Sequence, residues 1–225
     1  MLRMILMVCG VTVHQEPQSE KVASRQSEQA SVDEYAQWIE EAKNGNREAQ
    51  NALATALREP AFYFALQLIG NREDAHDVTQ DALIRFLGSL DRFESGRPAL
   101  PWLRRIVRNA VIDLQRRKNV RRADSLDSDG YEGEALEIVD QDEDAARRAV
   151  SQERREIVWN SLGRLPENHR EMVVLREYQD LSYQEIADLL EVPIGTVMSR
   201  LHRARLELRS RVLEAVEESE LEGLL

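Results

Sequence analysis

Two runs of apolar residues at helical spacing, joined by a tight turn, lie within residues 181–208. Before the first run, Ser182 and Glu185 have the spacing of a capping box, which starts a helix. Pro193 separates the runs, because proline disfavours helical geometry in the residue before it and can begin the next helix. The apolar positions are Tyr183, Ile186, Ala187 and Leu190, then Ile194, Val197, Leu201, Ala204 and Leu208. The pattern predicts a helix-turn-helix.

The second of these helices has a polar and basic outer face. Its members are Thr196, Ser199, His202 and Arg203, with Arg200 beside them. On a lone amphipathic helix such a face is usually only solvated. The capped helix and the short turn before it favour insertion into a DNA major groove instead. A helix-turn-helix by itself identifies only a DNA-binding module, so the function depends on what accompanies it.

Helical periodicity continues through most of the preceding chain. We expect a first helix over 33–43, a long helix over 47–69 that Pro60 kinks or divides, and a helix capped by Asn71 that reaches about Leu90. After a loop, another helix begins at residue 101 and runs to about residue 118. Its core-facing band is Trp102, Leu103, Ile106, Val107, Ala110, Val111 and Leu114.

Helix resumes near Ala145, and one more helix covers 167–178. Because no strand-like alternation of any length occurs, the chain is expected to be all-α, with two helical domains joined by a flexible acidic linker. The second domain is a four-helix unit that contains the helix-turn-helix. The expected divisions are a disordered N-terminal extension 1–31, a first domain 32–123, a linker 124–146, a second domain 147–213 and an acidic tail 214–225.

Charge is sharply divided along the chain. The formal net charge of -11 alone argues against a nucleic-acid partner. From 97 to 122, however, nine basic residues stand against the single acid Asp113, whereas from 124 to 144 there are ten acids and no basic residue. Such polarity indicates distinct roles for adjacent segments, and the acidic stretch, which contains Gly130 and Gly133, reads as a linker.

The helix that begins at residue 101 is a candidate nucleic-acid surface. Outside its core band lie Arg104, Arg105, Arg108, Asn109, Arg116 and Arg117. Arginines can neutralise phosphates, and an amide such as that of Asn109 can hydrogen-bond a base edge. A solvated basic face is the alternative, but so many like charges repel one another without a polyanion nearby. Trp102 is expected to be mainly core, with part of its ring at the surface.

An acidic face follows the Asn71 cap, where Asp74, Asp77, Asp81 and Arg85 recur at helical spacing beside Gln80. Three carboxylates could be imagined around a magnesium ion in a metal-dependent nucleic-acid enzyme. Acids on consecutive turns of one helix diverge outward, however, and metal sites usually draw ligands from several elements. We therefore expect a protein-docking face or a solvated face, and neither a metal nor another cofactor.

The composition limits the kinds of site and the cellular location that the chain can have. The chain contains one cysteine and four histidines, so an internal disulfide is excluded and no zinc site is expected. No apolar run approaches the roughly 18 residues of a membrane span. Residues 4–11 resemble a short signal h-region without a convincing cleavage site, so a misassigned start codon or a disordered extension is expected. These features fit a cytoplasmic protein.

In their order along the chain, these segments resemble the bacterial sigma factors of the extracytoplasmic-function group, in the sigma-70 family. The resembling stretches of the first domain are NREDAHDVTQDA at 71–82 and WLRRIVRNAVID at 102–113. Those of the second are LPE at 165–167, LSYQEIA at 181–187 and VPIGTVMSRLHRAR at 192–205. Each stretch alone is moderate evidence, but their combination around an acidic linker is highly specific. The resemblance spans about 33–212.

The resemblance implies a non-catalytic subunit that recruits core RNA polymerase to promoters and binds the β′ clamp helices and the β flap. The polymerase-binding residues would be Asp77, Gln80, Asp81 and Arg85. The minus-ten element would be opened and read by Trp102, Arg104, Arg105, Arg108, Asn109, Arg116 and Arg117, because melting requires capture of unstacked bases. The minus-thirty-five element would be contacted by Arg176, Thr196, Ser199, Arg200, His202 and Arg203. An anti-sigma partner is also implied.

Two positions depart from the pattern of the family. Glu191 stands where relatives commonly carry glycine, so the turn is expected to be less tight or slightly shifted. Met198 replaces a usual lysine or arginine, which removes one expected DNA contact. The functional alternatives are a sigma-like decoy that titrates an anti-sigma factor without binding DNA, and a dimeric helix-turn-helix repressor, which leaves the first domain unexplained.

Overall fold

The computed structural model describes residues 35–94, 96–124 and 145–222, with side chains described for 35–94, 96–120 and 152–217. Every regular element in these ranges is a helix, so the all-α prediction is confirmed. The chain divides into two compact units, one containing residues 35–124 and the other residues 145–222. The predicted N-terminal extension and almost all of the predicted linker lie outside the described residues.

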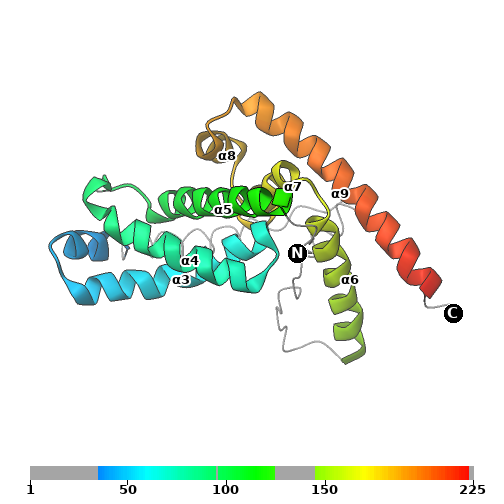
Figure 1. Cartoon of the computed structure of the whole chain (residues 1–225), viewed down its shortest axis with the longest axis horizontal. Coiled ribbons are helices and arrows are strands. Elements are labelled where there is room, and N and C mark those ends of the chain that lie inside the picture. The colour runs from blue at the N-terminus through cyan, green and yellow to red at the C-terminus, as the bar shows by residue number, and fades with distance from the viewer. Residues whose placement is uncertain (1–34, 95, 125–144, 223–225) are drawn as a thin grey trace, which may run out of the picture. The chain divides into compact units, whose positions relative to one another are not determined.

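The first unit is built around three helices, α3 (Arg47–Ile69), α4 (Arg72–Gly88) and α5 (Ala99–Asp124), preceded by helical residues 35–43. Each of α3, α4 and α5 packs against the other two, as the blue-to-green part of Figure 1 shows. Gly70 takes a left-handed φ of 76° at the end of α3, and the Asn71 side chain accepts the Asp74 amide at 3.0 Å to start α4. The predicted stop and cap are therefore confirmed.

Three sequence expectations in this unit need correction. Pro60 does not divide α3, which is one helix across it; the proline is exposed while its neighbours Leu57 and Ala61 are buried, so packing holds the helix together where a backbone donor is missing. Helix α4 stops at Gly88, and Leu90–Arg92 forms the 3₁₀ turn η1. Helix α5 starts at Ala99 and extends to Asp124, beyond the predicted end near residue 118.

The core of the first unit is apolar and aromatic. Its most deeply buried large side chains come from all its helices: Ile39, Leu53, Leu57, Phe64, Phe86 and Leu103. The band predicted on α5 is buried at Leu103, Val107, Ala110 and Val111 and half-buried at Trp102, Ile106 and Leu114. Burial of this band orients the remaining side chains of α5 outward.

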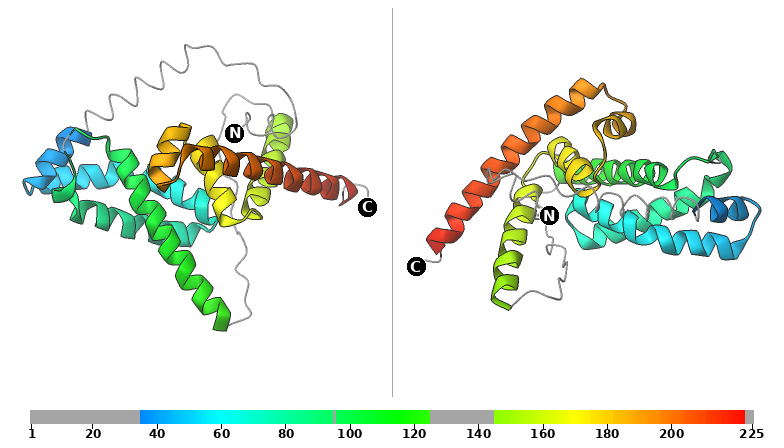
Figure 2. Two further views of the ribbon diagram at one scale, coloured as in Figure 1. Left: turned by 90° about the horizontal axis from the view of Figure 1, so that it is seen from above. Right: turned by 180° about the vertical axis from the view of Figure 1, so that it is seen from behind.

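The second unit contains α6 (Ala145–Gly163), α7 (Glu167–Val173), the π-helical turn η2 (Val174–Tyr178), α8 (Tyr183–Leu190) and α9 (Ile194–Glu222). Both views in Figure 2 show α9, in orange to red, as one unbroken rod. Helices α6, α7 and α8 each contact α9. The helix predicted over 167–178 is present, but its second half is a π turn, in which the Gln179 amide bonds to the Val174 carbonyl at 3.0 Å.

The core of the second unit is arranged around α9. Buried residues of α9 are Val197, Leu201, Ala204, Leu208 and Val212, and the other elements of the unit contribute the buried side chains of Trp159, Leu162, Met172, Leu175 and Ile186. Ile194 was expected in this stripe but is 45% exposed, because it is the first residue of the helix and lies beyond the end of the packed core. Residues 214 and 217 of the predicted tail are exposed positions of α9.

No helix in the described ranges is long and apolar enough to cross a membrane. The same ranges contain no cluster of three or more histidine, cysteine, aspartate or glutamate side chains that could hold a metal ion.

Candidate nucleic-acid interface

The helix-turn-helix forms as the sequence predicts, beginning with its cap. The Ser182 hydroxyl accepts the Glu185 amide at 3.2 Å, and the Glu185 carboxylate accepts the Ser182 amide at 2.8 Å. The Pro193 carbonyl accepts the amide of Thr196 at 2.8 Å, which starts α9. These local bonds fix both ends of the segment between the capping box and the recognition helix.

The turn between α8 and α9 keeps the conformation expected of a glycine. Glu191 has φ 56° and ψ 43°, the left-handed region, and its amide bonds back to the Ala187 carbonyl. The Val192 amide also bonds to Ala187, at 3.1 Å. The sequence predicts a less tight or slightly shifted turn at Glu191. The turn has not loosened; Glu191 adopts the strained left-handed geometry instead.

The predicted recognition face of α9 is accessible. Ser199, His202 and Arg203 are exposed, and Thr196 and Arg200 are half-buried. The Ser199 hydroxyl donates to the Thr196 carbonyl at 3.1 Å and so retains acceptor capacity. Met198, which replaces the lysine or arginine usual in the family, is 53% exposed on the same helix. Hydroxyl, imidazole, guanidinium and thioether groups thus share the first turns of α9.

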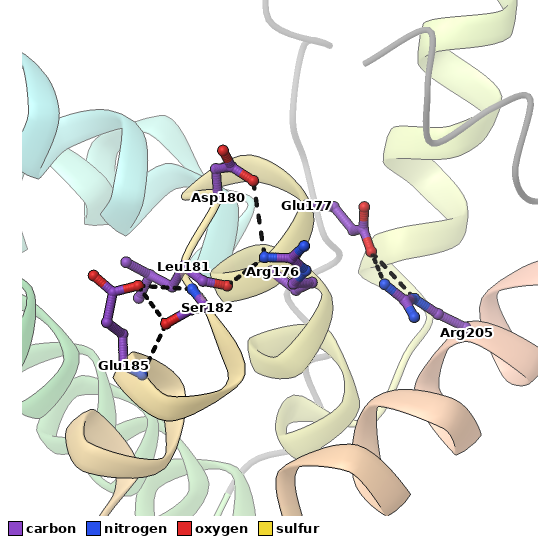
Figure 3. A network of polar contacts seen from close by, with 7 residues as sticks. All are labelled: Arg176, Glu177, Asp180, Leu181, Ser182, Glu185 and Arg205. Carbon is purple, nitrogen blue, oxygen red and sulfur yellow. Dashed lines mark hydrogen bonds and ion pairs between the residues drawn. The ribbon is translucent and has the colours of Figure 1, made fainter. Parts of the chain in front are cut away.

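Arg176 stabilises the approach to the helix-turn-helix. Its Nη1 donates to the Leu181 carbonyl at 2.7 Å and lies 3.9 Å from the Asp180 carboxylate, and its guanidinium carbon lies 5.5 Å from the centre of the Tyr183 ring. Figure 3 shows this side chain spanning from η2 to the segment before α8. The side chain is 33% exposed, so part of the guanidinium faces solvent. Sequence reasoning assigned it only to DNA; the structure adds a positioning contact.

A second ion pair fixes α9 to η2. Arg205 donates to the Glu177 carboxylate through Nε at 3.1 Å and Nη2 at 2.5 Å (Figure 3). Burial alone lowers the pKa of Arg205, but the hydrogen bond and charge of Glu177, with Tyr183, outweigh it and raise that pKa. For the neighbouring Tyr178, burial acts in the other direction and raises the pKa of the phenol, and the charge of Glu177 raises it further. Arg205 is therefore a structural cation within the resembling stretch.

Helix α5 presents the basic surface of the first unit. Arg105, Asn109, Arg116 and Arg117 are exposed, and Arg104 and Arg108 are half-buried. Trp102 packs between Phe86 and Phe93, with ring centres 4.5 and 4.8 Å away, and is half-buried as expected. The Phe93 carbonyl accepts Lys43 Nζ at 2.8 Å, which fixes the start of the loop before α5. The N-terminal end of the basic surface is thus held by an aromatic cluster.

The acidic face of α4 divides into two kinds of residue. Asp77 and Gln80 are exposed. Asp81 is bound by Arg85 in a two-pronged pair at 2.7 and 3.2 Å, and Arg85 also reaches Asp113 of α5 at 3.3 Å. The Asp81 carboxylate is therefore partly neutralised by its own chain.

Two features of this face escaped sequence reasoning. Asp74 bonds Lys118 of α5 at 2.6 Å, and no spacing rule connects residues so far apart in sequence. The ion pair between Asp113 and Arg85 could have been suspected from the sequence, because Asp113 is the single acid within a basic segment. Ile84 is 71% exposed on α4, and its spacing from Gln80 by four residues places it on the same side as the exposed polar groups.

Two family models match the chain: the model of sigma-70 region 2 over residues 53–121, and the model of sigma-70 region 4 over residues 155–208. The first contains α4 and most of α5, and the second contains the helix-turn-helix. Among curated proteins, the ECF RNA polymerase sigma factor SigW of Bacillus subtilis is 30% identical over 176 residues, which cover 77% of this chain and 94% of that protein. The chain belongs to the extracytoplasmic-function group of sigma-70 factors.

Other relatives agree with this assignment. The ECF RNA polymerase sigma-E factor of Escherichia coli K12 is 31% identical over 179 residues, covering 77% of this sigma factor and 92% of the relative. A solved structure of RpoE with the anti-sigma factor NepR from Bartonella quintana matches with a TM-score of 0.56 and 25% identity, over 70% of this chain and 92% of that one. The structure of CnrH, solved with the cytosolic domain of CnrY, matches with a TM-score of 0.54 and 28% identity. The match covers 81% of this chain and 98% of CnrH. The family directs RNA polymerase in promoter-specific transcription initiation.

Proposed function

We propose that this sigma factor binds core RNA polymerase through α4, opens and reads the minus-ten element with α5, and reads the minus-thirty-five element with α9. The observation that carries the proposal is the coexistence, in two separate units, of two helices with accessible arginine-rich faces, α5 and α9. One DNA-reading helix would suffice for a simple repressor. Two such helices fit a protein that holds two separate promoter elements.

Polymerase docking is proposed for the face of Asp77, Gln80, Asp81 and Arg85, opposite the β′ clamp helices. Exposed carboxylate and amide groups there can meet basic and polar groups of a partner. Ile84 adds an apolar contact at the same face, and buried apolar contacts usually contribute most to such interfaces. Asp81 acts together with Arg85 as a paired unit rather than as an isolated anion.

Strand opening is proposed for the exposed side of α5. Its residues Arg104, Arg105, Arg108, Arg116 and Arg117 would neutralise phosphates, and Asn109 would contact a base. Trp102 is held by Phe86 and Phe93, so it would support the adjoining loop rather than stack freely on a base. The ion pairs Asp74–Lys118 and Arg85–Asp113 join the docking helix to the DNA helix, which favours transmission of the docked position to α5.

Upstream recognition is proposed for Thr196, Ser199, Arg200, His202 and Arg203, with the free edge of the Arg176 guanidinium on a phosphate. These side chains lie on or next to the accessible start of a helix-turn-helix recognition helix. The second unit, proposed as residues 147–213, would also meet the β flap. The first unit is proposed as residues 32–123 and the acidic segment 124–146 as the connection.

An anti-sigma factor is proposed as a further partner, because the similar sigma factor RpoE is bound to the anti-sigma factor NepR in its solved structure. The similar protein CnrH is also bound to a partner, the cytosolic domain of CnrY. We propose a cytoplasmic location, which follows from the proposed action on core polymerase and promoters.

The proposal is tested by reconstitution of core polymerase with the full chain. We expect a stable complex and transcripts from a defined promoter class. Asp77→Lys should weaken core binding at least tenfold, because it reverses an exposed charge at the docking face. Glu59→Lys makes the same charge change at an exposed position of α3 and should bind core normally. Failure of the wild-type chain to form any complex, or equal binding by Asp77→Lys, contradicts the proposal.

A further inference from the structure

The first turns of α9 carry an apolar strip beside the polar recognition groups. Met198 is 53% exposed and Ile194 is 45% exposed. They are four residues apart on one helix, so their side chains are neighbours. Ser199 follows Met198 directly and His202 lies one turn later, and both are exposed. A large apolar side chain therefore borders the groups that face outward for recognition, next to His202.

The position of Met198 along α9 determines what it can meet. In a helix-turn-helix, the N-terminal residues of the recognition helix are the ones that reach base edges in the major groove. There the methyl group of thymine is the apolar feature that distinguishes one base from the others. A methionine side chain has a flexible, polarizable thioether that can follow such a group. It offers no cation for a phosphate or a guanine.

We propose that Met198 contacts the C5 methyl group of a thymine in the upstream promoter element, and so makes this sigma factor select thymine at one position. The inference rests on the proposed function of α9 and adds the chemical group that one side chain selects. Ile194 borders the contact on its N-terminal side and shields it from water. Ser199, His202 and Arg203 supply the hydrogen bonds and charge around it.

The first experiment identifies the position. Core polymerase with the full-length chain transcribes a promoter library whose upstream element is randomised, and the productive sequences are recovered. The wild-type chain should enrich thymine at one position, and Met198→Ala should lose that enrichment alone. Leu213→Ala is the matched control, because Leu213 is another exposed apolar residue of α9, 45% exposed, about 22 Å along the helix. It should leave the selected sequence unchanged.

The second experiment removes only the methyl group. Deoxyuridine replaces the selected thymidine, which leaves every hydrogen-bonding group in place. With the wild-type chain, this replacement should weaken promoter use about fourfold, the effect of exposing one methyl group. Met198→Ala should use both templates equally. Met198→Lys should also lose the discrimination while its promoter use becomes more sensitive to salt, because the new ammonium can neutralise a phosphate.

The outcomes separate the two levels of the proposal. A wild-type chain that forms a complex with core but enriches no upstream sequence overturns the proposed role of α9, and the role of Met198 with it. If the wild-type chain enriches an upstream sequence but does not discriminate between thymine and uracil, only the Met198 inference is overturned. The same holds if Met198→Ala keeps the wild-type discrimination, or if its only defect is weaker binding to core polymerase, which assigns Met198 to a protein contact.

Discussion

At Glu191 the backbone adopts a left-handed conformation that usually requires glycine. The left-handed φ of 56° places the Glu191 Cβ against its own backbone, and this costs about 1–2 kcal/mol for most residue types. The turn keeps this geometry because the Val192 amide and the start of α9 depend on it. The strain is thus retained to hold the recognition helix in position relative to α8.

Glu191→Gly should therefore stabilise the protein by about 0.5–1 kcal/mol, since relief of the strain exceeds the extra chain entropy that glycine loses on folding. Urea unfolding followed by circular dichroism measures this difference. Glu191→Ala is the matched control: it removes the carboxylate but keeps Cβ, so it should bring no comparable gain. A glycine variant that unfolds at lower urea than the wild-type chain would disprove the strain argument.

Arg176 shows why a single side chain can carry two roles. Its bond to the Leu181 carbonyl satisfies a backbone acceptor just before the capping box, while a third of the side chain stays exposed. If Arg176 contacts a phosphate as proposed, a loss of DNA binding in an Arg176 variant has two sources, the lost phosphate contact and a displaced α8. Unfolding measurements on the same variant are needed to separate them.

At the scale of elements, α4 and α5 are joined by two ion pairs of different burial. Asp74 and Lys118 are 20% and 28% exposed, whereas Arg85 and Asp113 are 45% and 46% exposed. Solvent and salt screen the second pair more strongly, so it contributes less to stability. Both pairs nevertheless fix the proposed docking face of α4 relative to the basic helix α5.

Lys118→Met should destabilise the first unit by about 1–2 kcal/mol, because it leaves a largely buried carboxylate without this partner. Asp113→Asn should cost less than about 1 kcal/mol. Thermal unfolding of the full chain compares the two variants at low and at high salt. If the two variants are destabilised equally and salt does not change either value, the argument from the difference in burial is wrong.

How far the elements could be predicted depends on the range of the interactions that define them. Caps such as Asn71 and Ser182 act within three residues, so the sequence alone located them. The span of α3, residues 47–69, was predicted correctly, but the division considered at Pro60 does not occur, because tertiary packing, which sequence periodicity does not reveal, holds that helix together. The π turn over 174–178 and the Asp74–Lys118 pair also depend on contacts between distant segments. The accessible faces of α5 and α9 were predictable, since burial of the apolar stripe determines the opposite side.

At the scale of the whole molecule, the three proposed tasks are distributed over two compact units. The first unit combines the proposed polymerase-docking face with the proposed strand-opening helix, and the second contains the proposed upstream reader. In the proposed arrangement, binding energy from core polymerase and from duplex DNA supports melting. The net negative charge does not prevent this arrangement, because the basic residues are concentrated on particular helix faces.

The most direct test of this division is footprinting of one promoter bound by core polymerase with the full-length chain. A variant with Arg200→Ala and Arg203→Ala should bind core normally and lose protection of the upstream element. A variant with Arg116→Ala and Arg117→Ala should keep that protection but show fewer unpaired, permanganate-reactive thymines downstream. If both variants give the wild-type footprint and the wild-type degree of opening, α5 and α9 do not hold separate promoter elements.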